Sequence, residues 1–176
     1  LRATLVVAMG AVLTGTVMTW PAPAQAPRGQ AAPAAHEIAG LSFSAPADAE
    51  VTEQTGFPEG VAVVAVTRGD EVLLLTAYTG GSAPKADAAL ARHTDQMERE
   101  GGKAGAAIAV ETVWLRLLGR NRSANKVTWG PAERRAVARV VAARRNKATV
   151  VAAWTLPASQ RDSFSTGLVR ELTVTP

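Results

Sequence analysis

The sequence predicts an α+β domain in which an antiparallel sheet is flanked by helices. Three observations support this prediction. Short runs in which apolar and polar residues alternate recur along the chain, and turn residues bound them. Two other segments place apolar residues three or four positions apart, as helices do. The 176 residues are 47% hydrophobic and 19% charged, a composition typical of one globular domain.

The first 24 residues are typical of a cleaved signal peptide. Arg2 precedes an apolar stretch over 5–13, and Ala22 and Ala24 have the small-residue spacing of a cleavage site. A second such pair would put Pro27 beside the cut bond, so we expect cleavage after Ala24. The alternative is a retained membrane anchor, which needs about 20 apolar residues. We therefore expect an exported protein, periplasmic or secreted, with no transmembrane segment after signal cleavage.

Residues 25–36 are rich in alanine and proline, and we expect a loose linker there. A single α+β domain is expected over 37–176. Arg68-Gly69-Asp70-Glu71 is predicted to form a hairpin turn between two strands. The alternative, that Arg68-Gly69-Asp70 is an adhesion tripeptide, is not favoured, because a turn selects these residue types anyway. The first strands are predicted over 38–44, 51–55, 61–67, 72–78 and 108–118.

Two helices are predicted. Asp87 is a candidate N-cap for the first, and Gly101-Gly102 is expected to end it. Ser159 is a candidate N-cap for the second, which closes the chain. The buried faces are expected to carry Leu90, His93 or Thr94, and Met97 in the first helix, and Phe164, Leu168 and Leu172 in the second.

Residues 133–145 fit either a strand or a helix. Their alanines and arginines favour a helix, and Pro131 suits a first helical turn. A tight turn at 145–147 and a strand-like run of matching length over 149–156 favour a hairpin. We expect the hairpin.

In this order the elements resemble those of the Mog1/PsbP-like family of α-β-α sandwiches. The resemblance rests on an opening strand of the type Leu41-Ser42-Phe43-Ser44-x-Pro46, a long hairpin, a helix after a glycine break, further antiparallel strands, and a closing helix with Ser163-Phe164 and Leu168. It covers residues 37–175, and it departs from the family pattern after Pro46, where no aromatic residue stands. It implies an accessory or binding role, and it carries over no functional residue because the family has no common catalytic set.

The sequence offers little material for catalysis. It has no cysteine, which excludes disulfides, thiolate metal sites and a cysteine nucleophile in this chain. Its histidines are His36 and His93; Ser82 does not lie in a nucleophile elbow, and Gly101-Gly102-Lys103 lacks the first glycine of a phosphate loop. We predict a protein that is not an enzyme and binds no metal or cofactor. A hydrolase that pairs Ser82 or Asp95 with His93 is the weakest alternative.

Charge is distributed unevenly along the chain. Residues 25–111 contain 6 basic and 12 acidic side chains, whereas residues 112–176 contain 12 basic and 3 acidic ones. The basic half is expected either to form a face for an anionic partner or to be neutralised by the acidic half. The candidate patch consists of Arg116, Arg120, Arg134, Arg135, Arg139, Arg144 and Arg145.

These observations favour a non-catalytic accessory or binding protein of the bacterial envelope, whose partner is another envelope protein. The alternative is a surface-docking module that binds anionic lipid or polysaccharide through the basic C-terminal half. Nucleic acid is not expected as a partner, because an exported protein rarely meets it. Trp114, Trp129 and Trp154 lie near the basic residues, and we expect all three to be core residues.

Overall fold

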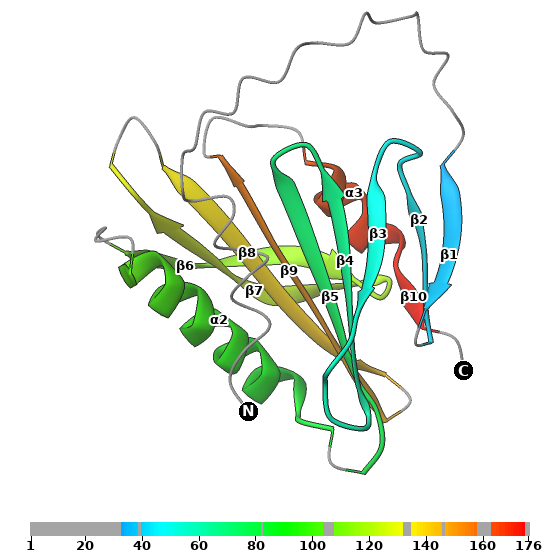
Figure 1. The fold of residues 1–176 in the computed structure, drawn as a ribbon. Helices are drawn as coiled ribbons and strands as arrows, with labels where there is room; N and C mark the ends of the chain where they lie inside the picture. Colours follow the sequence, from blue (N-terminus) through cyan, green and yellow to red (C-terminus); the bar gives the residue numbers. More distant parts are fainter. Residues whose placement is uncertain are drawn as a thin grey trace, which may run out of the picture.

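The computed structural model describes residues 33–38, 40–81, 83–103, 108–131, 135–145, 147–157 and 163–174. They form antiparallel sheets flanked by two helices, which confirms the predicted class at that level (Figure 1). The main sheet has seven strands in the order β3-β4-β5-β9-β8-β7-β6, and a small sheet has the order β1-β2-β10. The predicted signal peptide lies outside the described residues.

The first two strands form a hairpin within the small sheet. β1 (Ala34–Ile38) pairs antiparallel with β2 (Leu41–Ala45), and Gly40 between them has a φ of +75°. The sequence predicts one strand over 38–44, and this is wrong because the chain reverses at that glycine. Residues 34–36, predicted to belong to the linker, are part of β1 because they pair with β2.

Three strands then form a meander at one side of the main sheet: β3 (Glu50–Gln54), β4 (Val61–Arg68) and β5 (Glu71–Tyr78). Each predicted strand is confirmed to within one residue. Arg68 pairs with Glu71, so Gly69 and Asp70 form a two-residue loop in which Gly69 has a φ of +58°. The predicted hairpin turn is therefore confirmed.

Helix α2 (Ala86–Lys103) packs on β7, β8 and β9. It starts one residue before Asp87, so Asp87 lies in its first turn and not at its N-cap. It also continues through Gly101 and Gly102, contrary to the prediction that they end it. Gly101 lets the helix approach Trp129 closely, because a Cβ atom there would lie 3.1 Å from Trp129 Cγ. The predicted face is confirmed, because the buried residues of α2 include His93, Thr94 and Met97.

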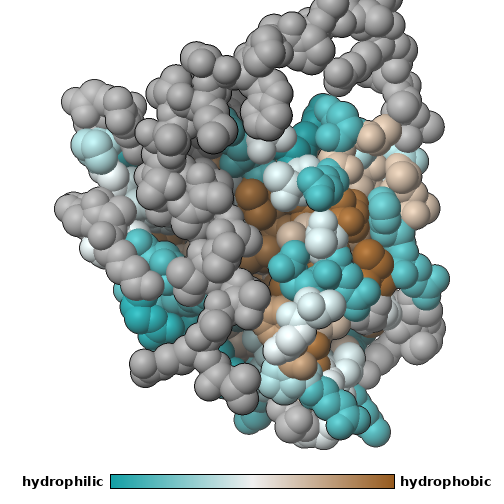
Figure 2. All heavy atoms as spheres, viewed as in Figure 1, coloured by the Kyte–Doolittle hydropathy of each residue, from teal (hydrophilic) through white to brown (hydrophobic). Residues whose placement is uncertain are grey.

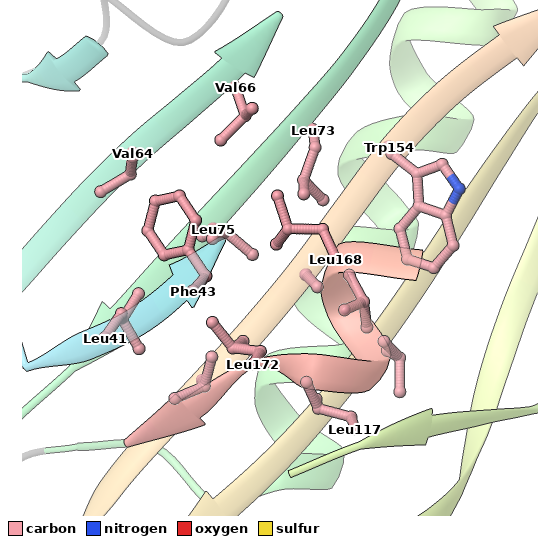
Figure 3. Packing of buried hydrophobic residues seen from close by; sticks show 14 of the residues in the cluster. Leu41, Phe43, Val64, Val66, Leu73, Leu75, Leu117, Trp154, Leu168 and Leu172 are labelled. Carbon is pink, nitrogen blue, oxygen red and sulfur yellow. The ribbon is translucent and has the colours of Figure 1, made fainter. Parts of the chain in front are cut away.

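Four long strands complete the main sheet: β6 (Ala109–Leu117), β7 (Arg120–Trp129), β8 (Ala136–Arg145) and β9 (Ala148–Pro157). The β8–β9 ladder confirms the predicted hairpin and overturns the helical alternative for β8. β7 pairs with β8 only from Ala124 onward, so its first four residues pair with β6 alone. β8 itself continues through Arg145, so the end of the β6–β7 hairpin diverges from β8. Figure 3 shows Leu117 of this hairpin beside α3.

Helix α3 (Phe164–Glu171) begins after Ser163, whose Oγ accepts a hydrogen bond from the Thr166 backbone N–H at 3.2 Å. The predicted cap, Ser159, lies outside the described residues. Leu168 and Leu172 are buried, as predicted. The chain then adds β10 (Thr173–Val174) to the free side of β2.

Two apolar layers share the central strands. On one face of the main sheet, β2 and α3 cover a core that includes Leu73, Leu75 and Trp154 (Figure 3). On the other face, α2 covers a core that includes Met97 and Trp129. In Figure 2 the visible part of α2 is hydrophilic, whereas hydrophobic side chains reach the surface on the neighbouring part of the sheet. Strands buried on both faces have nearly continuous apolar sequences, as β5 and β9 do.

Candidate functional site

The arginines of the predicted patch that the structure describes do not form one surface. Arg135 and Arg145 stand at opposite ends of β8, about 30 Å apart at the rise of an extended strand. Arg144 donates hydrogen bonds at 2.9 and 3.1 Å to two backbone carbonyls that precede α2. Arg134 lies outside the described residues. The physical reason is that one strand spreads its residues over its whole length.

Arg116 lies instead with an arginine that the sequence did not single out. Arg116 in β6 and Arg170 in the last turn of α3 line one cavity of about 310 Å³ between the β6–β7 hairpin and α3. Among the described residues, its lining includes no carboxylate. We call this cavity the hairpin pocket; it is lined by Trp114, Leu115, Arg116, Asn121, Thr166, Val169 and Arg170.

The hairpin that forms one wall of the pocket is anchored at its turn. Leu117 pairs with Arg120, so Leu118 and Gly119 form a two-residue loop with φ angles of +51° and +77°. This is the backbone of a type I′ turn, which leucine rarely adopts. Leu118 is held there because its side chain is buried with Leu117 in the core beneath α3. That anchoring fixes the hairpin relative to α3.

Two further arginines extend the positive charge around the hairpin pocket. Arg122 in β7 is partly buried, and its Nε atom is buried with no hydrogen-bond partner. Arg139 in β8 donates to the neutral Thr166 Oγ1 at 3.3 Å. Among the described residues, neither of these guanidinium groups forms an ion pair with a carboxylate. Arg116, Arg122, Arg139 and Arg170 thus place several positive charges beside α3, which favours an anionic ligand.

Trp114 is exposed at the hairpin pocket. Its side chain is 73% exposed, whereas Trp129 and Trp154 are 6% and 0% exposed. The prediction of three core tryptophans is therefore confirmed for two of them and wrong for Trp114. The reason is alternation along β6, where Val113 and Leu115 face the core and Trp114 faces away from it.

A Tyr–His contact joins α2 to β5. Tyr78 Oη and His93 Nε2 are 3.0 Å apart, and the rings meet edge to face. Burial, and secondly the positive charge of Arg92, lowers the pKa of His93 to about 4. Burial raises the pKa of Tyr78 and outweighs the opposite effect of Arg92. Both groups are thus neutral at pH 7. His93 bonds to Tyr78 and not to Asp95, which does not match the hydrolase alternative, and Ser82 lies outside the described residues.

A second cavity, of about 700 Å³, lies beside the β4–β5 turn and contains charges that are already engaged. Arg68 Nε pairs with Asp48 Oδ2 at 3.0 Å. The buried carboxylate of Glu71 accepts hydrogen bonds from Ser163 Oγ and, at 3.1 Å, from the Ser165 backbone N–H. Glu71 therefore holds the start of α3 against β5, as a carboxylate at a helix N-terminus does.

The remaining titratable groups that the structure describes form no metal site. His36 stacks on Phe43 within the small sheet, with ring centroids 5.4 Å apart. In the described part of the chain, no three histidine or carboxylate side chains lie close enough together to hold a metal ion. None of the described helices has the length and apolar character needed to cross a membrane.

Sequence-based prediction missed three polar residues of the hairpin pocket, namely Asn121, Thr166 and Arg170. Arg170 is followed by Glu171 and stands apart from the arginine-rich segments, so no local charge pattern marks it. Only the packing of α3 against β6 brings it to Arg116. A helical alignment of Thr166 and Arg170, four residues apart, is the single sequence signal that links any two of these residues.

Comparisons with known proteins do not assign the chain to a family. No family model matches it, and no curated protein matches it. A crystal structure from Bacteroides thetaiotaomicron is similar over 78% of this chain and 46% of its own, with 13% sequence identity and a TM-score of 0.44. The chain thus spans about half the length of that protein.

Proposed function

We propose that this protein is a non-catalytic binding protein that holds an acidic macromolecule at the hairpin pocket. One observation carries the proposal: Arg116 and Arg170 line the same pocket with the exposed Trp114, and no described lining residue is acidic. Guanidinium groups are weakly hydrated and donate paired hydrogen bonds to carboxylates. Tryptophan and arginine are also enriched among the residues that contribute most to binding surfaces.

The placement of the titratable groups supports binding over catalysis. His93 is buried beneath α2 with its pKa lowered to about 4, so it is neutral and shielded from substrate at pH 7. Glu71 is committed to the start of α3. Neither residue lines the hairpin pocket.

We also propose that the protein is exported, periplasmic or secreted, and that its fold is of the Mog1/PsbP-like type. The signal-like residues 1–24 support export. An antiparallel sheet between α2 and α3 supports the fold proposal. An accessory role in the envelope, with another envelope protein as partner, is consistent with both.

Binding of three polyanions tests the proposed function. Poly-L-glutamate, polygalacturonate and vesicles of anionic phospholipid are each titrated into the full chain at low and at high salt. We expect poly-L-glutamate to bind most tightly, with at least a tenfold loss at high salt because exposed charges are screened over about 10 Å at 0.1 M. Arg116→Glu/Arg170→Glu should abolish binding. Tighter binding of the polysaccharide or the vesicles would favour the surface-docking alternative instead.

Arg99→Glu/Arg135→Glu is the matched control. It changes the net charge by the same amount as the pocket variant, and both of its residues are exposed. Arg99 is on α2, across the sheet from α3, and Arg135 immediately precedes β8. We expect this variant to bind like the unmodified protein. Equal losses in the two variants would mean that net charge drives binding, and the pocket proposal would be abandoned.

A further inference from the structure

The two edges of the main sheet are protected to different degrees. β3, at one edge, has five residues and carries Glu50 and Glu53. Short length and charge are the usual means by which proteins prevent an edge strand from pairing with another chain. β6, at the other edge, also carries two charged residues, Glu111 and Arg116, but it has nine residues and contains neither proline nor lysine. Among the described residues, β6 pairs on one side only.

β6 also displays an apolar stripe. The large hydrophobic side chains exposed in the described part of the chain are Ile108, Val110 and Trp114, at 37%, 46% and 73% exposure. Even-numbered positions of a strand point to one side, so Val110 and Trp114 share a face with Thr112 and Arg116. Ile108 directly precedes the strand. An added strand would therefore find unpaired backbone groups and an apolar surface at the same edge.

The charges around this edge favour one kind of occupant. Arg116 and Arg170 stand at the hairpin end of β6, and Glu111, the one carboxylate in the strand, is paired with Lys126 at 3.0 Å. A second copy of this chain would bring like charges together at the edge, which opposes association. An acidic segment would be attracted there instead.

We propose that β6 accepts an extended acidic segment of a partner protein as an eighth strand of the main sheet. Backbone hydrogen bonds along β6 supply the pairing, as in other complexes formed by strand addition. Val110 and Trp114 contact apolar side chains of the segment, and Arg116 and Arg170 bind its carboxylates. This inference rests on the proposed function and adds the partner class and the mode of binding.

A synthetic pair of peptides tests the mode of binding. The first is a capped peptide of alternating valine and aspartate with about the length of β6, and the second has the same sequence with alternate backbone nitrogens methylated. Methylation removes hydrogen-bond donors without changing charge. We expect the first peptide to protect the β6 amides of the full chain from hydrogen exchange, and the methylated peptide to bind at least tenfold more weakly. Equal affinities, or binding without protection of β6, would overturn strand addition.

A charge-increasing variant separates this inference from the proposed function. Val110→Lys/Thr112→Lys disrupts the apolar stripe but makes the edge more basic, and Thr52→Lys/Gln54→Lys adds the same charge to β3 as a control. We expect the β6 variant to lose at least tenfold in peptide affinity and the β3 variant to keep it. If the β6 variant binds the peptide as tightly as the unmodified chain, strand addition is wrong. If the β6 variant loses the peptide but still binds poly-L-glutamate, the proposed function is still supported. That function has its own test, in which Arg116→Glu/Arg170→Glu loses poly-L-glutamate and the control variant keeps it.

Discussion

At the scale of single residues, His93 shows how the fold changes the chemistry of a side chain. Burial, followed by the charge of Arg92, lowers its pKa from the ordinary value of 6.5 to about 4. Between these values the unfolded chain binds a proton that the folded chain excludes. The free energy of unfolding is therefore highest above pH 6.5 and falls as the pH decreases toward 4, by about 3 kcal/mol at most for this group.

His93→Gln should reduce this pH dependence, because glutamine keeps a hydrogen-bonding group near Tyr78 but does not titrate. We expect the unmodified protein to lose about 2 kcal/mol more stability than the variant between pH 7 and pH 4.5. Urea unfolding followed by tryptophan fluorescence at both pH values measures the difference. If both proteins lose the same amount, the histidine is already accessible to protons in the folded state.

At the scale of elements, α2 shows why two adjacent glycines in one helix are not equivalent. A Cβ atom on Gly101 would lie 3.1–3.3 Å from three atoms of Trp129, whereas one on Gly102 would meet only Ile108 Cδ1, at 3.7 Å. Gly101 therefore permits the close packing of α2 on β7, and Gly102 has no such role. Both glycines lie inside the helix, contrary to the prediction that they end it, and packing against Trp129 accounts for Gly101 alone.

Gly102→Ala should stabilise the protein by as much as about 1 kcal/mol, because alanine favours helix more than glycine does. Gly101→Ala should gain less or destabilise the protein, because Trp129 must shift. Thermal unfolding followed by circular dichroism compares the two variants directly. Equal stabilisation by both would mean that the indole adjusts without cost.

The β6–β7 hairpin is the element that the sequence described least well. The pattern over 108–118 predicts β6, but the polar residues that open β7 give no strand signal. Leu118 is a poor turn residue by local rules, and its left-handed φ of +51° is maintained by burial of its side chain beneath α3. Local propensity therefore fails at the place where tertiary contacts shape the hairpin pocket.

At the scale of the whole molecule, β8 and β9 contribute side chains both to the core beneath α3 and to the core beneath α2. The two apolar layers should therefore unfold together. Met97→Ala on the α2 side and Leu168→Ala on the α3 side should each destabilise the protein by about 2–5 kcal/mol. Each variant should keep a single transition. Urea unfolding monitored both by far-ultraviolet circular dichroism and by tryptophan fluorescence measures this. Different midpoints for the two signals would show that the layers separate.

The sequence by itself determined the features that depend on neighbouring residues. Alternation and turn chemistry predicted β3, β4 and β5 and the loop at Gly69, and a short turn between runs of equal length predicted the β8–β9 hairpin. Composition also established that the second half of the chain is basic. These properties follow from local sterics and from counting charges, so no distant contact is needed to find them.

Only the tertiary structure decided which basic residues act together. β8 separates Arg135 from Arg145, while packing of α3 on the sheet brings Arg170 to Arg116 beside an exposed Trp114. Likewise β1 and β10 exist as strands because they pair with β2, and β10 is distant from β2 in the sequence. The reason is that the direction of a side chain and the free edge of a strand depend on what packs beside them, which residues far along the chain supply.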